Sequence, residues 1–125
     1  MDEQVQEKIG QIQLIQQSLE NFGMQRQQFQ LQQTEMEAAL SEMENSSTVY
    51  KIIGNIMILS DKDKLRKELG EKKEMLDIRI NTIEKQEDKL RSRVEELQKD
   101  IMKGLEQKSN DKKSKKRQNE QQGSD

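Results

Sequence analysis

Residues 48–60 read TVYKIIGNIMILS, and this short stretch decides how the rest of the chain can fold. β-Branched and other apolar residues lie on both sides of the Gly54-Asn55 pair. Two such runs separated by two turn-forming residues predict a β-hairpin, and a glycine at the first turn position can adopt the positive φ of a type II′ turn. A two-stranded hairpin is only marginally stable in water, and this one has two apolar faces and two open edges. We therefore expect another copy or another subunit to cover it.

The composition of the 125-residue chain differs from that of a globular domain. It is 30% hydrophobic and 37% charged, whereas globular domains are usually about 45–50% apolar. The absence of proline removes the main helix breaker, and the absence of cysteine fits a reducing compartment. No run approaches the roughly 18 apolar residues of a membrane span, and the first ten residues lack a signal-peptide profile. We expect a mostly helical protein of the cytoplasm.

The segments on either side of the hairpin carry the apolar period of a coiled coil. Residues 2–45 form a heptad seam in which nine of twelve a and d positions are apolar. Residues 61–106 contain an unbroken d series, namely Leu69, Leu76, Ile83, Leu90 and Leu97. Seams of this length indicate coiled-coil helices. The fold class predicted is mostly α, a long antiparallel two-helix coiled coil with one short β-hairpin, at residues 48–60, in the helix–helix turn.

The reversal at the hairpin also predicts which residues face each other. Folding at Gly54-Asn55 pairs residues whose numbers sum to about 109, which brings Val5 near Gly104. Asn45-Ser46-Ser47 should end the first helix, since these side chains compete for backbone hydrogen bonds. Ser60 is the expected N-cap of the second helix.

Of the polar seam positions, four fall towards the middle and base of the helices, and two interpretations of them remain open. The four are Arg26, Gln33, Lys73 and Glu87. They can specify the register as a buried polar layer, with Arg26 beside Glu87. Alternatively, their long side chains can extend out of the seam to solvent.

Apolar residues outside the seam suggest a second kind of surface. Several gather where the N-terminus meets residues 100–105, and a two-helix tip has no third layer to cover them. Others, such as Met24, Leu31, Met75 and Ile78, lie along the middle of the helices. Binding at the tip and ordinary scattered exposure are both compatible with this pattern.

The whole arrangement resembles a β-type prefoldin subunit, archaeal in style. The resemblance is carried by the hairpin text VYKIIGNIMILSDKDK and by the helix ELGEKKEMLDIRINTIEKQEDKLRSRVEELQKDI that follows it. It covers residues 1–106. Residues 107–125 fall outside it; from Lys108 onward they contain no apolar residue, which predicts a disordered charged tail.

The resemblance implies an assembly and an activity. Two α-type and four β-type subunits would form a hetero-hexamer whose hairpins build an intersubunit β-barrel. The hairpin residues for assembly would be Val49, Tyr50, Ile52, Ile53, Ile56, Ile58 and Leu59. The assembly would be an ATP-independent holdase that captures unfolded client proteins at the coiled-coil tips and delivers them to a group II chaperonin. Matched by location alone, the client-binding residues would be Val5, Ile9, Ile12, Met102 and Leu105.

Other classes of function are less compatible with the residues. The chain has no histidine, no cysteine and no glycine-rich phosphate loop, so we expect no enzyme, no metal and no cofactor. A structural coiled-coil scaffold is an alternative, although a rod would not need the apolar hairpin. The basic run KKSKKR at 112–117 could contact nucleic acid. Acidic residues flank that run and residues 108–125 contain no aromatic side chain for base stacking, so a solubilising tail is favoured.

Overall fold

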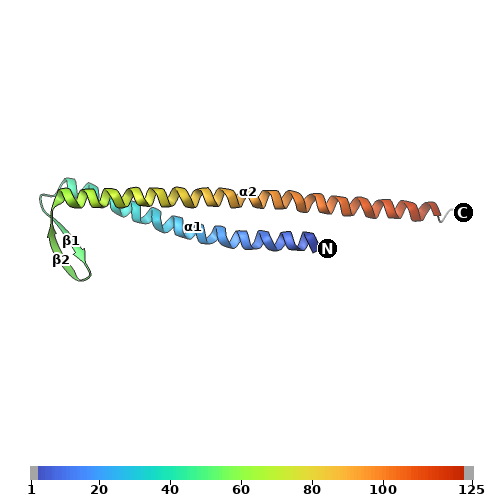
Figure 1. Ribbon diagram of the computed structural model, residues 1–125, viewed down its shortest axis with the longest axis horizontal. Helices are drawn as coiled ribbons and strands as arrows, with labels where there is room; N and C mark the ends of the chain where they lie inside the picture. The colour runs from blue at the N-terminus through green and yellow to red at the C-terminus, as the bar shows by residue number, and fades with distance from the viewer. Residues whose placement is uncertain (1–2, 123–125) are drawn as a thin grey trace. The chain divides into compact units, whose positions relative to one another are not determined.

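The computed structural model describes the backbone of residues 3–122 and the side chains of residues 3–107. The elements in order are α1 (Glu3–Glu44), β1 (Val49–Ile53), β2 (Ile56–Ser60) and α2 (Lys62–Gln122), as Figure 1 shows. Two long helices joined by a short antiparallel hairpin confirm the predicted fold class. The chain divides into two compact units. One, the terminal unit, comprises Met1–Glu20 and Asp88–Asp125, and the other, the hairpin unit, comprises Asn21–Glu87.

The hairpin forms with the predicted turn. β1 and β2 pair antiparallel, from Val49 opposite Ser60 to Ile53 opposite Ile56. Gly54 has a φ of 60°, and no other described residue has a positive φ. A type I′ turn would require positive φ at both central residues, so the turn is type II′. Gly54 therefore supplies the one backbone conformation in the hairpin that side-chain-bearing residues adopt only with strain.

Helix α1 ends as the sequence predicted. The backbone N–H of Asn45 donates to the carbonyl of Glu42 at 3.2 Å, and the Ser46 hydroxyl donates to the same carbonyl at 3.1 Å. The ammonium group of Lys62, in the first turn of α2, donates to the Ser46 carbonyl at 2.8 Å. The last turn of α1 is thus satisfied by local groups and by the start of the other helix.

The N-cap of α2 is Asp61, where the sequence had suggested Ser60. The Asp61 carboxylate accepts the N–H of Asp63 at 3.1 Å, and its carbonyl accepts the N–H of Leu65 at 3.0 Å. Ser60 is still paired with Val49 in the sheet, and its hydroxyl donates to the carbonyl of Ile58. The strand ends at residue 60, as expected, and because Ser60 stays paired in the sheet the cap falls on the next residue.

Helix α2 extends beyond the end that the sequence suggested. Its expected end was residue 106, followed by a disordered tail over residues 107–125. In the structure the helix continues to Gln122, and residues 123–125 lie outside the described part. The added segment consists largely of lysine, glutamine, glutamate and arginine without proline. These residues propagate a helix well, so the loss of the apolar period does not end it.

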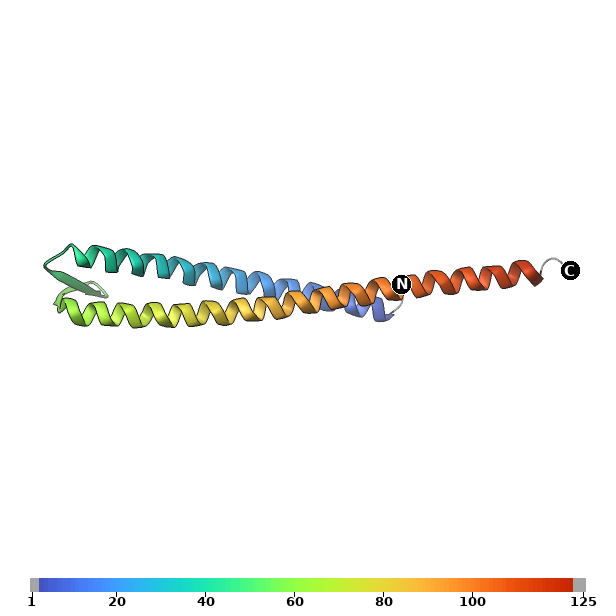
Figure 2. The ribbon, with the colours of Figure 1, turned by 90° about the horizontal axis from the view of Figure 1, so that it is seen from above.

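Each unit has a small apolar core between its segments of α1 and α2, which run antiparallel within the unit (Figure 2). In the hairpin unit the buried apolar residues are Met43, Val49, Leu76, Ile80 and Ile83. In the terminal unit they are Val5 and Leu97, and Leu97 is only 1% exposed. A Cβ atom at Gly104 would lie 3.4 Å from Cγ2 of Val5, so the two helices approach closely there. This contact confirms the predicted pairing of Val5 with Gly104. Within the described residues, no helix is long and apolar enough to cross a membrane.

Candidate interaction surfaces

The two faces of the hairpin have different surroundings. Because side chains alternate along a strand, Val49 and Lys51 point to one face and Tyr50 and Ile52 to the other. On the first face Val49 is buried and Lys51 is half-buried, while the isoleucines nearer the turn are exposed, namely Ile53, Ile56 and Ile58. On the other face every side chain is apolar, and all are between 55% and 68% exposed. These residues are Tyr50 and Ile52 of β1 and Met57 and Leu59 of β2. We call these four residues the outward face.

An ion-pair cluster fixes the other side of the hairpin to α2. The ammonium nitrogen of Lys51 lies 2.8 Å from a carboxylate oxygen of Glu68, and that of Lys72 lies 3.6 Å from the same oxygen. The hydrogen bond from Lys51 is the main cause that lowers the pKa of Glu68 below its usual value, and the charge of Lys72 adds to it. The cluster ties β1 to the second turn of α2.

A groove of about 490 Å³ runs between β1 and the adjoining ends of the two helices. Val49, Tyr50, Lys51 and Ile52 form its strand side. The helix side is formed by Ala39, Glu42, Met43, Ser46, Leu65, Glu68, Leu69 and Lys72. These four strand residues are consecutive, so they belong alternately to the two faces of the hairpin. The groove therefore follows the free edge of β1, where both faces can be reached.

The backbone of the hairpin also presents unpaired groups. Ile53 and Ile56 flank a two-residue turn and form a hydrogen-bonded pair, so the next pair, Ile52 with Met57, is of the non-hydrogen-bonded type. In such pairs the N–H and C=O groups point away from the partner strand, and both hairpin edges can therefore accept a further strand.

The predicted assembly residues fall into two groups in the structure. Val49 is buried within its own chain. The other six, Tyr50, Ile52, Ile53, Ile56, Ile58 and Leu59, are exposed. Met57 belongs with the exposed group and was missed by the sequence reasoning, although its place opposite Ile52 could have identified it. Seven exposed apolar side chains among the strand residues of one hairpin form a surface typical of a protein interface.

The predicted client-binding residues are less uniform. Met102 is 59% exposed and Leu105 is also exposed. Ile9 and Ile12 are half-buried, and Val5 is buried against Gly104. In the described conformation Val5 therefore supports the end of the terminal unit and is not accessible to a partner. Only Ile9, Ile12, Met102 and Leu105 remain available as contacts.

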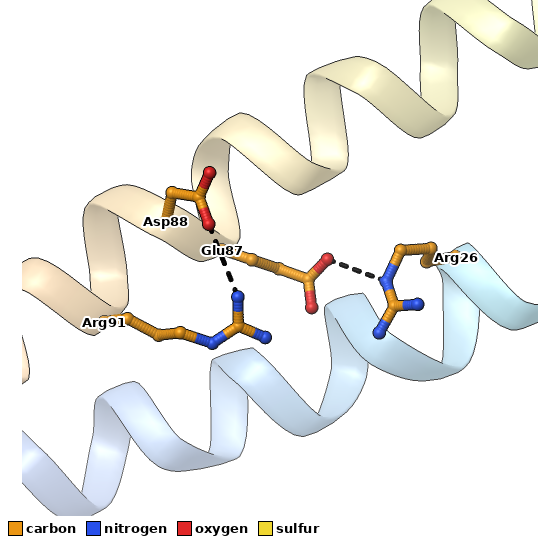
Figure 3. Close-up of polar contacts among 4 residues, drawn as sticks. All are labelled: Arg26, Glu87, Asp88 and Arg91. Atoms are coloured by element: carbon orange, nitrogen blue, oxygen red, sulfur yellow. Dashed lines mark hydrogen bonds and ion pairs between the residues drawn. The ribbon is translucent and has the colours of Figure 1, made fainter.

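A buried ion pair crosses the seam of the hairpin unit. Nε of Arg26 lies 2.9 Å from a carboxylate oxygen of Glu87, which is only 2% exposed (Figure 3). On α2 itself, Arg91 lies 3.4 Å from Asp88, as the same view shows. Among the described side chains, no buried polar atom is without a hydrogen-bond partner. The Arg26–Glu87 contact is thus a buried polar layer, the first of the two open interpretations.

The other two polar seam residues behave differently. Lys73 pairs with Glu37 at 3.3 Å, with both side chains more than a third exposed. The Gln33 amide donates to the carboxylate of Asp77, also at an exposed position. These two side chains leave the seam for its rim, as the second interpretation proposed. Within the hairpin unit, the seam therefore contains one buried polar layer and two polar contacts on its surface.

Comparison with known proteins identifies the same architecture elsewhere. A sequence model of the prefoldin subunit family matches residues 6–108. The chain is 38% identical over 105 residues to prefoldin subunit beta of Methanothrix thermoacetophila, with 82% of this chain and 88% of the relative covered. It is 42% identical over 98 residues to prefoldin subunit beta of Archaeoglobus fulgidus, with 76% and 84% covered.

A solved structure is similar over most of its length as well. The crystal structure of the prefoldin beta subunit from Thermococcus strain KS-1 has a TM-score of 0.78 and 39% sequence identity to this chain. The match covers 83% of this chain and 94% of the other. Subunits of the prefoldin family form hexamers with other prefoldin subunits, and the family is one of chaperone subunits with no known enzymatic activity. With its long helices, its single hairpin and these relatives, the chain belongs to the prefoldin family as a β-type chaperone subunit.

Proposed function

We propose that this chain acts as one subunit of an ATP-independent holdase in the cytoplasm. In this proposal it assembles with α-type prefoldin subunits into a hetero-hexamer of two α-type and four β-type chains. The observation that carries the proposal is the hairpin. Its seven exposed apolar residues and two open edges are incomplete within one chain, whereas the helices already have a buried core. Strands from neighbouring subunits would pair with both edges and close a barrel, which leaves no edge open.

The client contacts of the proposed holdase lie at the end of the terminal unit. Ile9, Ile12, Met102 and Leu105 offer apolar side chains there. Each contact is weak, but one assembly contains several subunits. A client bound to one subunit therefore meets the contact residues of the other subunits at a high effective concentration. Weak contacts that act together release a client by simple dissociation, so no nucleotide is required. Transfer of the released client to a group II chaperonin would complete the cycle.

The test is the aggregation of a chemically unfolded client protein after dilution into buffer without ATP. Light scattering is compared for this chain alone, for the chain assembled with an α-type partner, and for buffer. The proposal expects scattering to be suppressed most strongly by the assembled hexamer, near one assembly per client. Unchanged scattering in the presence of a hexamer verified by sedimentation would contradict it.

A paired variant locates the contact within the assembly. Met102→Gln with Leu105→Gln removes two exposed apolar side chains and leaves the buried Val5 and Leu97 in place. This variant should assemble normally and hold clients less well. Val5→Ala should instead lower the melting temperature of the chain, because it opens a cavity beside Gly104.

A further inference from the structure

The exposed surface of α1 over residues 21–34, in the hairpin unit, carries no charge. The exposed residues of α1 between residues 21 and 34 are all uncharged. They are Asn21, Met24, Gln25, Gln27, Gln28, Gln30, Leu31 and Thr34. The only charged residue in this stretch is Arg26, which is half-buried and bound to Glu87. A solvated helix face of this length ordinarily mixes acidic and basic side chains, so the lack of charge calls for an explanation.

Two apolar side chains stand out on this face. Met24 and Leu31 are 59% and 60% exposed. They are seven residues apart, which places them two helical turns apart on one side of α1, about 10 Å along the axis. That distance corresponds to about three residues of an extended polypeptide. Gln27 and Gln28 lie between them at helical spacing, and no hydrogen bond of these two amides occurs within the described part of the chain.

The facing helix of the same unit provides an internal comparison. Between residues 71 and 86 of α2 the exposed charged residues are Glu71, Lys72, Glu74, Asp77, Arg79, Glu84 and Lys85. Two apolar side chains, Met75 and Ile78, are exposed there as well, at 54% and 62%. The two helices thus expose similar apolar side chains, but only on α1 are the exposed positions between the two apolar residues occupied by uncharged amides; the exposed carboxylates of Glu20 and Glu35 lie beyond the two ends of this segment.

From this contrast we propose that Met24, Leu31 and the glutamines between them form a second client-contact face, fitted to extended segments of non-native protein of either charge. This inference rests on the proposed holdase function and adds a surface to it. An uncharged face repels neither acidic nor basic segments, whereas the mixed charges of α2 select against one or the other at each position. Glutamine amides both donate and accept, so they match the unpaired peptide groups of an unfolded chain. Methionine adapts its shape to different apolar side chains.

The first experiment locates the contact directly. A photo-cross-linking amino acid is placed at Gln28 or, as a matched control, at Gln86, an exposed glutamine on α2 of the same unit. A third assembly carries it at Met102. The hexamer formed with an α-type partner is mixed with a chemically unfolded client and illuminated. The inference expects cross-links to the client from position 28 and few from position 86. Equal cross-linking at 28 and 86, or cross-linking from 102 alone, would overturn it and leave the holdase function intact.

The second experiment measures the contribution to holding. Met24→Gln with Leu31→Gln should raise the amount of hexamer needed for half-suppression of aggregation by about five-fold, since two apolar contacts are lost. Met75→Gln with Ile78→Gln removes a similar apolar surface from α2 and should change the amount of hexamer needed for half-suppression only little. A change in the hexamer itself, seen by sedimentation of the first variant, would mean that the face contacts another subunit and would overturn the inference. If the unaltered hexamer suppresses no aggregation, the proposed function fails instead.

The third experiment tests the role of the missing charge. Gln27→Glu with Gln28→Glu adds two negative charges without altering Met24 or Leu31. Capture of an acidic client should fall by several-fold, while capture of a basic client should be kept or improved. Equal losses for both clients, or no loss for either, would contradict the argument from charge.

Discussion

The hairpin and the paired helices of the hairpin unit use apolar side chains in opposite ways. The helices place theirs in a seam, where Leu76, Ile80 and Ile83 are buried within one chain. The hairpin buries only Val49 and leaves seven apolar side chains exposed. The helical part therefore has a core within one chain, whereas most of the apolar surface of the hairpin is left uncovered. In the proposed function, other subunits cover that surface.

The largest effect is expected from changes to the outward face of the hairpin. Ile52→Lys with Leu59→Lys should weaken association with other subunits by about 100-fold or more, because two charges would enter an apolar interface. Helix content should not change, since both side chains are exposed in the single chain. Met75→Lys with Ile78→Lys adds the same charge to exposed positions of α2 and serves as the control. Sedimentation with an α-type partner and circular dichroism measure the two properties. Equal loss of assembly in both variants would show that the exposed apolar residues of the hairpin matter no more for association than those of α2.

Within the helices, the next largest effect concerns the buried ion pair. Arg26→Leu removes one ion-pair partner of a residue that is 2% exposed, Glu87, and should lower the free energy of unfolding by about 3 kcal/mol. Arg26→Leu with Glu87→Leu should recover most of that loss, because an apolar pair replaces the polar layer.

The exposed Lys73–Glu37 contact is the control for the buried pair. Lys73→Leu should change the free energy of unfolding by less than about 1 kcal/mol. Denaturant titrations of all three variants test the comparison. Similar losses for Arg26→Leu and Lys73→Leu would show that burial does not distinguish the two contacts.

Replacing a glycine by alanine should change stability in opposite directions in the hairpin and in the helix. Gly54→Ala places a side chain at a φ of 60° and should destabilise the hairpin by about 1 kcal/mol. Gly70→Ala lies in α2, where an added Cβ meets no atom within 4 Å, and should stabilise the helix by about 1 kcal/mol. Thermal unfolding of the two variants gives both signs in one experiment. A stabilising Gly54→Ala would contradict the assignment of a type II′ turn.

The smallest effect is expected where the hairpin meets α2. The pKa of Glu68 is lowered mainly by the hydrogen bond from Lys51. Because the pKa is lower in the folded chain than in the unfolded chain, this contact stabilises the folded chain at pH values above the usual glutamate pKa of about 4.3. The stabilisation is lost as the pH falls below that value and the carboxylate becomes protonated. Lys51→Met should therefore raise the pKa of Glu68 towards its usual value, as followed by NMR. Lys72→Met should raise it less, and an unchanged pKa in Lys51→Met would contradict the assigned cause.

Much of the fold could be predicted because its signals are local or periodic. The Gly54-Asn55 pair determines the turn, and the turn determines the register that brings Val5 to Gly104 and Arg26 to Glu87. The N-cap at Asp61 was missed because serine and aspartate are equivalent caps by type. The choice between them depends on how far β2 stays paired.

The surfaces were harder to predict than the fold. Both hairpin faces are apolar in sequence, so the outward face is distinguishable only once Val49 and Lys51 are placed against the helices. Val5 is apolar, as a client-contact residue would be, yet Gly104 allows the helices to approach closely enough to bury the Val5 side chain. Which side of a short apolar segment is covered depends on distant residues, and a single sequence does not reveal that.

The register set by the hairpin also imposes an order on folding. Lys62 and Ser46, beside the turn, are 16 residues apart in the chain, whereas Gln33 and Asp77 are 44 apart and Arg26 and Glu87 are 61 apart. Since the entropy lost on closing a loop grows with its length, contacts next to the turn form most readily. Each contact then shortens the loop that the next one must close, so we expect the helices to pair progressively outward from Gly54. Unfolding is expected to run in the reverse direction, with the contact between Val5 and Gly104 among the first to separate.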